Sequence, residues 1–141
     1  MLQIIQIQPY GVYQEAEIIS LYRSVGWTNY TNRPEMLEAA YRNSLCILGA
    51  YDGDKLIGVI RAVGDGVSIV FVQDLLVLPA YQRQGIGTRL LQAILERYSD
   101  VYQIELLTDN TAKTNAFYES LGMTRADRLG CCAYIKMNTL S

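Results

Sequence analysis

The sequence predicts an α+β fold around one mixed β-sheet, and two observations carry this prediction. Three apolar segments at 45–51, 56–63 and 68–77 are separated by turn residues, which is typical of an antiparallel meander. Apolar residues then recur at helical spacing over 90–98, and another apolar segment follows at 102–108. A strand, a helix and a strand in this order form a right-handed crossover between parallel neighbours, so the predicted sheet is mixed.

The elements outside this region follow from the same periodicity arguments. Alternating apolar and polar residues predict a short first strand at 5–8. Helical spacing predicts helices over 13–25 and 34–43. A helix over 111–121 and a last strand over Cys131–Met137 complete the chain. The predicted order is therefore β-α-α-β-β-β-α-β-α-β, which is an α+β plan.

Composition limits both the organisation and the chemistry. The 141 residues contain no linker, repeat or low-complexity segment, so residues 1–141 are predicted to form a single domain. The net charge of −2 argues against nucleic acid as a partner. Histidine is absent, which excludes Ser-His-Asp and Cys-His triads and histidine-containing zinc sites, and we expect no metal. Proton transfer must then use carboxylates, tyrosine, cysteine, lysine or water.

The cysteines and the lack of long apolar runs bear on location. Cys46, Cys131 and Cys132 form an odd set with one adjacent pair, which is a poor disulfide framework and predicts a reducing, cytoplasmic compartment. We interpret all three as packing residues in apolar strands. No apolar run approaches about 18 residues, so neither a signal peptide nor a membrane span is expected.

The segment Gln82–Thr88, with the sequence QRQGIGT, is the sharpest local feature of the chain. Its two glycines allow a tight turn and close approach of a ligand, and the N–H groups at a helix start bind anions such as pyrophosphate. It does not match a P-loop, because Thr88 occupies the position of the required lysine. Leu90 stands where the dinucleotide motif needs a third glycine. A glycine-rich helix start without a ligand is the alternative interpretation.

Two separate motifs resemble those of the GNAT superfamily of N-acetyltransferases. Leu75-x-Val77-x-Pro79, followed by the glycines of Gln82–Thr88, is similar to the acyl-CoA-binding signature of that family. The segment 115–123, NAFYESLGM, is similar to its second hallmark, a helix ending in Phe-Tyr before a glycine. The predicted order of elements also matches the family. The resemblance implies a central mixed sheet of about six to seven strands flanked by about four helices.

The resemblance also implies that the chain binds acetyl-CoA as its acyl donor. The strand before the glycine loop is expected to diverge from its parallel neighbour, which lets backbone groups pair with the pantetheine arm and polarise the thioester carbonyl. The family's usual Asn-x-x-Ala spacing is not kept, so the amide contact is assigned to Asn110 or Asn115. The residues assigned to the cofactor are Leu76, Val77, Gln82, Arg83, Gln84, Gly85, Ile86, Gly87, Thr88, Asn110 and Asn115.

Three residues are candidates for proton transfer. Tyr118 matches the tyrosine that protonates the departing CoA thiolate in this family; the alternative is a core aromatic beside Phe117. Asp74 is a charge within an apolar strand, where burial favours a general base; the alternatives are a structural brace and a surface position. Tyr81, just before the glycine loop, is a second candidate for a proton path or a substrate contact.

Trp27 and Tyr30 lie in a predicted loop that corresponds to the wall of the acceptor pocket in this family. They are predicted either to stack on an amine substrate or to cap the core. A narrower similarity, carried by Val25-Gly26-Trp27 and by residues 73–82, is to small bacterial acetyltransferases and in part to plant-type arylalkylamine acetyltransferases.

The predicted function is direct transfer of the acetyl group from acetyl-CoA to a primary amine, with a small-molecule acceptor. Two alternatives stay open at this point. One is a protein or peptide N-acetyltransferase, which needs an open peptide groove. The other is a non-catalytic acyl-CoA-binding regulatory module. The resemblance adds the expectation of a homodimer.

Overall fold

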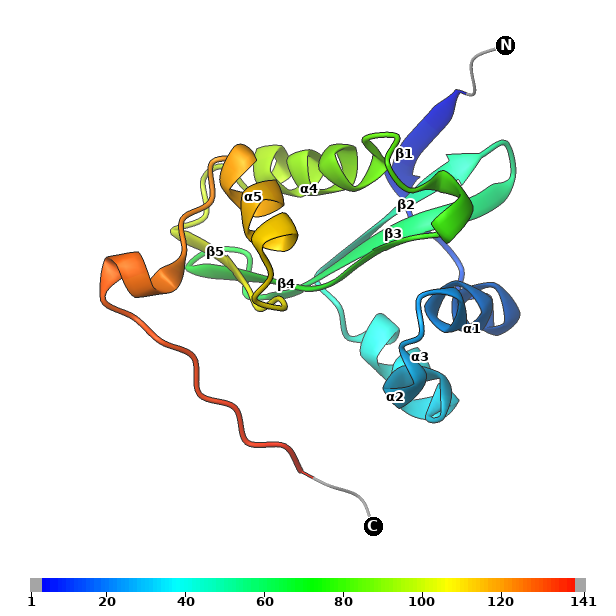
Figure 1. The fold of residues 1–141 in the computed structure, drawn as a ribbon. Helices are drawn as coiled ribbons and strands as arrows, with labels where there is room; N and C mark the ends of the chain where they lie inside the picture. The colour runs from blue at the N-terminus through cyan, green and yellow to red at the C-terminus, as the bar shows by residue number, and fades with distance from the viewer. Residues whose placement is uncertain (1–3, 139–141) are drawn as a thin grey trace. The chain divides into compact units, whose positions relative to one another are not determined.

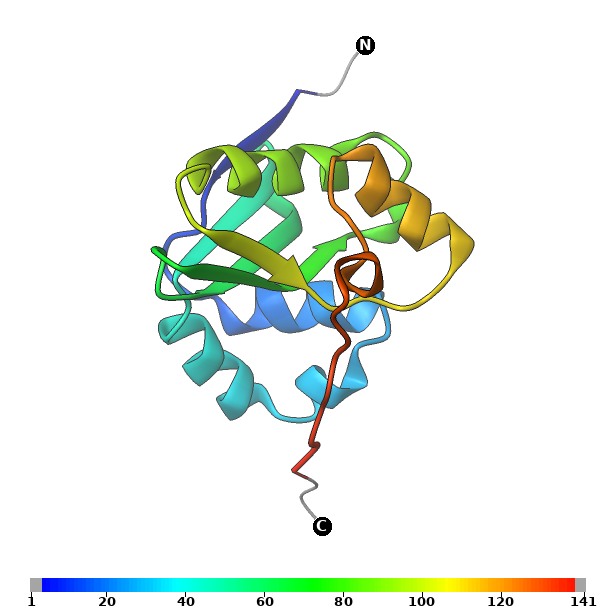
Figure 2. The same cartoon turned by 90° about the vertical axis from the view of Figure 1, so that its left-hand side faces the viewer.

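The computed structural model describes residues 4–138 and contains two units, one ending at Leu107 and one beginning at Thr108. The single domain expected for residues 1–141 stays a prediction. Within the first unit, α1–α3 lie on one face of a five-stranded sheet and α4 lies on the other (Figures 1 and 2). Its elements are β1 (Ile5–Pro9), α1 (Glu15–Ser24), α2 (Thr28–Thr31), α3 (Pro34–Arg42), β2 (Cys46–Asp52), β3 (Lys55–Gly64), β4 (Ile69–Val77), the 3-10 helix η1 (Pro79–Tyr81), α4 (Ile86–Arg97) and β5 (Gln103–Leu106).

The sheet order β1-β2-β3-β4-β5 confirms the predicted α+β fold. All neighbours are antiparallel except β4 and β5, which run parallel and are joined through α4. The meander and the crossover therefore both form. The described residues contain five strands, fewer than the six to seven expected.

Both faces of the sheet carry apolar helix stripes, as the periodicity predicts. On the α4 face, the stripe contributes Leu90, Leu91 and Ile94, each 0% exposed. On the opposite face, side chains of α1 and α3 pack against β3 and β4. The buried members of this second cluster are Ile18, Leu21, Tyr22, Leu37, Tyr41, Leu56, Val59 and Leu76. Helices thus pack against both faces of the sheet that contains β4.

The second unit contains α5 (Ala112–Ser120) and the 3-10 helix η2 (Ala126–Leu129). The Thr111 side chain caps α5 by accepting a hydrogen bond from the Thr114 N–H, and Gly122 follows the helix with φ 85°. The predicted strand at Cys131–Met137 is wrong: this segment is extended but pairs with no strand among the described residues. A sequence can favour strand geometry, but a ladder also needs a neighbouring backbone.

Within residues 4–138, no helix has the length and apolar character needed to cross a membrane.

Candidate active site

The two parallel strands diverge halfway along β4. Parallel pairing joins Ile69–Val72 to Gln103–Leu106 and stops there, whereas β4 continues to Val77. The remaining part of β4, residues 73–77, has no partner strand on this edge within the described part of the chain. The parallel pairing thus ends before β4 does, as the expected divergence requires, and residues 73–77 have no ladder partner on this edge among the strands of the first unit.

A β-bulge lies at the start of this divergence. Asp74 on β4 pairs with Arg61 on β3, and Val72 pairs with Ala62, the next residue along β3. Gln73 is therefore the extra residue on β4, without a partner of its own on β3. Such a bulge interrupts the ladder and changes the direction of side chains around it.

Backbone directions distinguish the two residues expected to meet the pantetheine arm. The Leu78 N–H donates to the Ile57 carbonyl of the β3 side at 2.8 Å. Because successive backbone amides of a strand point to opposite edges, Leu76 also faces β3 and Val77 faces the open edge. The Val77 carbonyl accepts a hydrogen bond from Gln82 Nε2 at 3.0 Å, in agreement with this direction.

The loop between η1 and α4 contains two residues with left-handed backbone. Gly85 has φ 78° and forms the N-cap of α4. Arg83 has φ 66° and is the one non-glycine residue with positive φ within residues 4–138. Such a conformation costs an ordinary residue about 1–2 kcal/mol, and strain of this kind clusters at ligand clamps.

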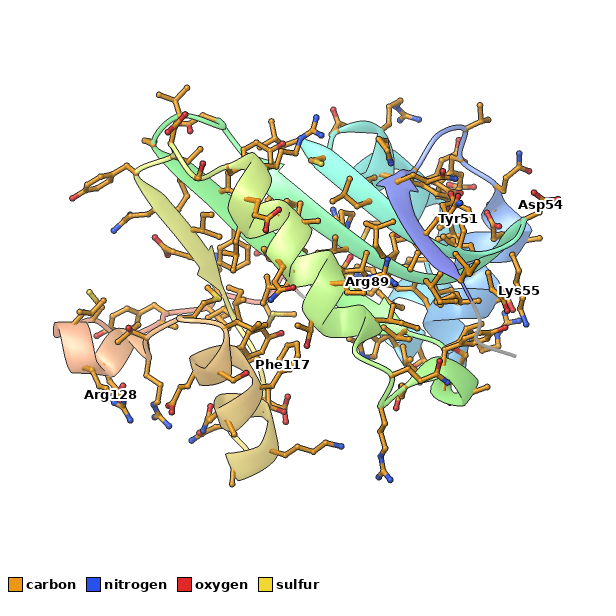
Figure 3. The ribbon with its side chains drawn as sticks, turned by 90° about the horizontal axis from the view of Figure 1, so that it is seen from above. Tyr51, Asp54, Lys55, Arg89, Phe117 and Arg128 are labelled. Carbon is orange, nitrogen blue, oxygen red and sulfur yellow. The ribbon has the colours of Figure 1, made fainter. Side chains whose placement is uncertain are left out.

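The start of α4 offers donors to an anion. The N–H groups of Ile86, Gly87 and Thr88 lie in the first helical turn, where they have no partner within the helix, and the positive end of the helix dipole lies there too. The neighbouring Arg89 turns away and donates from Nη2 to the Ile5 carbonyl at 2.8 Å (Figure 3). The loop and the helix start can therefore hold a pyrophosphate largely through backbone groups.

Gly85→Ala is expected to lower the free energy of unfolding by about 1 kcal/mol, because alanine pays a steric cost at φ 78° although no atom lies within 4 Å of its Cβ position. Urea unfolding checks this value. Gly11→Ala is the matched control, since Gly11 has equally open space and no positive φ, and it should be neutral or slightly stabilising. Equal losses in the two variants would contradict the backbone explanation.

Tyr81 is bonded to the turn between β2 and β3. Its hydroxyl donates to Asp52 Oδ2 at 2.6 Å, and Lys55 Nζ lies 5.7 Å from the centroid of its ring. The sequence analysis missed Asp52 and Lys55, because both lie in a segment whose composition is already explained by the turn between two strands. These contacts hold η1, and hence the start of the glycine loop, against the sheet.

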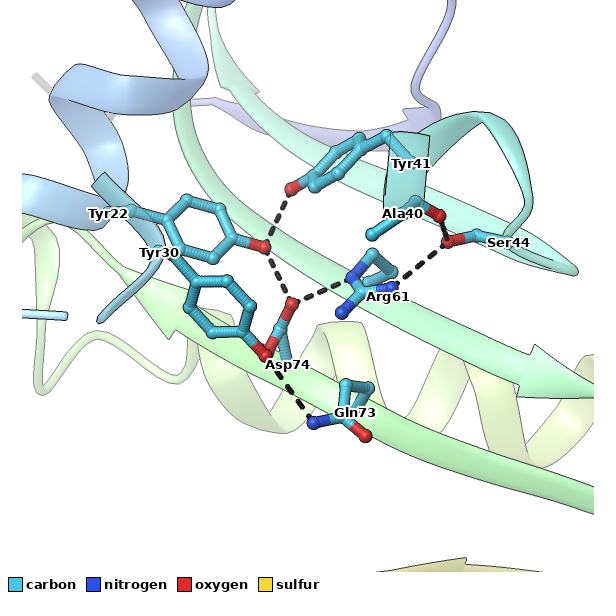
Figure 4. Close-up of polar contacts among 8 residues, drawn as sticks. All are labelled: Tyr22, Tyr30, Ala40, Tyr41, Ser44, Arg61, Gln73 and Asp74. Carbon is cyan, nitrogen blue, oxygen red and sulfur yellow. Dashed lines mark hydrogen bonds and ion pairs between the residues drawn. The ribbon is translucent and has the colours of Figure 1, made fainter. Parts of the chain in front are cut away.

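Asp74 lies at the centre of a buried polar network (Figure 4). Its Oδ2 atom accepts hydrogen bonds from Arg61 Nε at 2.7 Å and from the Tyr22 hydroxyl at 2.8 Å. The Tyr22 hydroxyl also lies 2.8 Å from the Tyr41 hydroxyl, and Arg61 Nη1 donates to Ser44 Oγ at 3.3 Å. Asp74 and Arg61, 2% and 5% exposed, form a buried ion pair. One carboxylate thus connects β4 with β3, α1 and, through Tyr22, α3.

Burial changes the titration of this network. It raises the pKa of the Tyr22 and Tyr41 hydroxyls well above the ordinary value of 10, so both stay protonated donors at neutral pH. Burial lowers the pKa of Arg61, but the charge and hydrogen bond of Asp74 outweigh it and leave a net increase. The sequence analysis missed Arg61, Tyr22 and Tyr41. The sequence did offer one signal for this network: Arg61 is a charged residue within the otherwise apolar segment 56–63 of β3.

Trp27 and Tyr30 pack on the ring of Tyr22. The ring centroids lie 5.8 Å and 5.3 Å from that of Tyr22, both in edge-to-face geometry. Both residues are half-buried against the core cluster that contains Tyr22. The Tyr30 hydroxyl accepts a hydrogen bond from Gln73 Nε2 at 3.4 Å. The predicted loop therefore contains a short helix, α2, that packs on the core and presents two aromatic rings.

The second unit carries the remaining candidates. Tyr118 lies on α5 with its ring edge-to-face with that of Phe117, 4.9 Å between centroids. Burial raises the pKa of Tyr118 above its usual value, so the phenol is protonated at neutral pH. Asn115 Nδ2 donates to Asn110 Oδ1 at 2.9 Å, and this oxygen also accepts from Arg125 Nη1 at 3.3 Å. The two asparagines assigned to the cofactor are therefore bonded to each other.

The described residues contain no group of three or more cysteine, aspartate or glutamate side chains arranged to hold a metal ion. The unpaired edge of β4, the glycine turn and the start of α4 together match the arrangement that the resemblance to the GNAT superfamily implies for an acyl-CoA-dependent acyltransferase. Comparisons with known proteins agree. The profile of the Acetyltransferase (GNAT) family matches residues 12–123. The chain belongs to this family and is an N-acetyltransferase.

Individual relatives support the same assignment. A GNAT family acetyltransferase from Streptococcus pneumoniae TIGR4 is 44% identical, with a TM-score of 0.86 over 96% of this chain and 98% of that one. The ycf52-like N-acetyltransferase of Prochlorococcus marinus is 31% identical over 84% of this chain and 67% of its own length. A histone acetyltransferase of Glycine max is 30% identical over 75% of this chain, which spans half of that protein.

Proposed function

We propose that this chain transfers the acetyl group of acetyl-CoA to the primary amine of a small molecule. The observation that carries the proposal is the open edge of β4 beyond Val72, which ends at the backbone turn of Arg83 and Gly85. The edge suits the amide groups of pantetheine, and the turn with the start of α4 suits the pyrophosphate.

The proposed reaction is a direct transfer. The unprotonated amine attacks the thioester carbonyl, a carbon–nitrogen bond forms, and the carbon–sulfur bond breaks to release CoA thiolate. The outward-facing N–H of Val77 is assigned to the developing oxyanion. Tyr118 is assigned as the acid that protonates the thiolate. The proton lost by the amine goes to water, and solvent returns a proton to the Tyr118 phenolate before the next turnover. Tyr118 is protonated at neutral pH, as an acid must be, although burial raises its pKa and so does not itself favour donation.

The contacts of Asp74 favour the structural brace over the general base. Its carboxylate already accepts hydrogen bonds from Arg61 and Tyr22, and its side chain is 2% exposed. A base must reach the proton of the amine, directly or through one water. We therefore propose that Asp74 holds the acceptor side of the site together and that water removes the amine proton. Tyr81 is assigned to holding the glycine loop.

Asp74→Asn is expected to leave the shape of the pH–rate profile unchanged while lowering the free energy of unfolding by about 1–3 kcal/mol, because a charge-assisted pair is lost. Rates measured from pH 5.5 to 9.5, with urea unfolding of the same preparations, check both points. Suppose instead that Asp74→Asn abolishes the rise of the rate with pH and leaves the free energy of unfolding unchanged. This result would contradict a structural role for Asp74 and favour a role as general base.

The acceptor is assigned from the segment between α1 and α3. This segment contains α2 (Thr28–Thr31), and its residues Val25, Trp27 and Tyr30 pack against the core, which we take to favour a small acceptor over a peptide. Trp27 and Tyr30 present aromatic rings, which suit an aliphatic or aromatic amine. The test is thiol release from acetyl-CoA with 2-phenylethylamine, tryptamine, spermidine, free lysine and a peptide with a free N-terminus. Turnover of the peptide alone would favour a protein acetyltransferase, and tight acetyl-CoA binding with no turnover would favour a regulatory module.

A homodimer and a reducing, cytoplasmic location complete the proposal. The extended segment Cys131–Met137 supports the dimer, because Tyr134, Ile135 and Met137 are 94%, 65% and 76% exposed. Light scattering during size-exclusion chromatography measures the mass directly, and a mass of 15.9 kDa at micromolar concentration would reject the dimer.

A further inference from the structure

The Asp74 network and the aromatic rings of α2 meet at one side chain, Tyr22. Its hydroxyl donates to Asp74, while its ring carries Trp27 and Tyr30. Tyr22 is 0% exposed, so it cannot touch an acceptor bound at the surface. Any effect on the acceptor must act through the two rings that it supports.

At the bulge in β4, two consecutive residues form hydrogen bonds with tyrosines of α1 and α2. Successive side chains of a regular strand point to opposite faces of the sheet. At the bulge, consecutive residues of β4 both reach tyrosines of the helical side: Gln73 bonds Tyr30 and Asp74 bonds Tyr22 (Figure 4). The same point marks the end of β4–β5 pairing. The position of α2 is thereby tied to the point where the proposed acyl-CoA edge begins.

We propose that Tyr22 is a positioning residue for the acceptor amine: its hydroxyl bond to Asp74 fixes the ring on which Trp27 and Tyr30 pack. Arg61 supports the same bond from the opposite side by holding Asp74 Oδ2 in place. The effect of Tyr22 on the acceptor amine rests on the proposed function. Its effect on the position of Trp27 is independent of that function. Tyr22, Arg61 and Asp74 thus set the affinity for the amine without contacting it.

Tyr22→Phe tests the proposal, because it removes the hydroxyl and keeps the ring. Trp27 is the single tryptophan of the chain, so its fluorescence reports on α2 directly. We expect acrylamide quenching of Trp27 in the folded variant to increase about 2-fold, as the local segment loosens. With the fastest amine of the panel above, we expect the amine KM to rise about 10-fold and the acetyl-CoA KM to change by less than about 2-fold.

Two further variants separate positioning from stability. Tyr22→Phe leaves the Tyr41 hydroxyl without its partner, and Tyr22→Phe/Tyr41→Phe removes this defect, so the double variant should regain part of the lost Tm. Its quenching and amine KM should stay altered, since the Asp74 bond is still absent. Tyr10→Phe is the matched control, because Tyr10 packs on Tyr41 but bonds Gln14 and Glu17 instead of Asp74.

The proposal is overturned if quenching in Tyr22→Phe equals that of the unmodified protein, or if quenching and KM recover together with Tm in the double variant. If none of the amines is acetylated, the proposed function fails while the quenching result still decides the role of Tyr22. If amines are acetylated but the amine KM is unchanged in Tyr22→Phe, the function stands and the positioning role is rejected.

Discussion

Arg61→Met is expected to lower the free energy of unfolding by about 3–5 kcal/mol, because it leaves the Asp74 carboxylate buried without its cation. The guanidinium supplies a 2.7 Å charge-assisted hydrogen bond, and its other side bonds Ser44. With typical stabilities of about 5–15 kcal/mol, the loss is a large fraction of the total. The midpoint of urea unfolding, followed by circular dichroism, measures it.

A surface ion pair provides the control for this prediction. Arg42 lies 4.0 Å from Glu38 with both side chains exposed, and Arg42→Met should cost less than about 0.5 kcal/mol. In addition, Arg61→Met/Asp74→Leu should be more stable than Arg61→Met alone, since no buried charge is left unpaired. A double variant less stable than the single one would show that the charge is not the source of the loss.

Tyr118→Phe is expected to lower kcat by about 10²-fold or more, with little change in the dissociation constant of acetyl-CoA, because the proposed proton donor is lost while the ring is kept. Burial raises the pKa of Tyr118, so the phenol stays protonated across neutral and moderately basic pH. The loss in kcat should therefore be constant across neutral and moderately basic pH. Steady-state rates and calorimetric binding of acetyl-CoA measure the two quantities.

Tyr102→Phe serves as the matched control, because its side chain is 82% exposed and just precedes β5. Its kcat should equal that of the unmodified protein. An unchanged kcat in Tyr118→Phe would reject the acid and leave Tyr118 as a packing partner of Phe117.

The sequence analysis predicted the fold well where local pattern and burial agree. The stripe Leu90, Leu91 and Ile94 on α4 is fully buried, and the meander and parallel crossover form as expected. It failed at α2, a helix of four residues whose periodicity is too short to read, and at Cys131–Met137. The second failure has a physical cause: strand propensity is local, but strand pairing depends on a distant edge.

The site was only partly predictable for a related reason. The glycine loop could be read directly, because its residues are consecutive and Gly85 takes the left-handed conformation that glycine permits. Asp74 was recognised as unusual, yet its role depends on partners 13 and 52 positions away, Arg61 and Tyr22. No sequence spacing indicates which of eleven tyrosines a buried carboxylate will meet.

The residue types and their local order were therefore enough to establish a histidine-free chemistry, an α+β sheet with one crossover, and a glycine turn before α4. Tertiary structure decided three further points: where β4 leaves β5, how the bulge at Gln73 directs neighbouring side chains, and which hydroxyls surround Asp74. The physical reason is range. Backbone preferences act within a few residues, whereas a buried charge is compensated by whatever groups the packing of separate elements brings within about 3 Å.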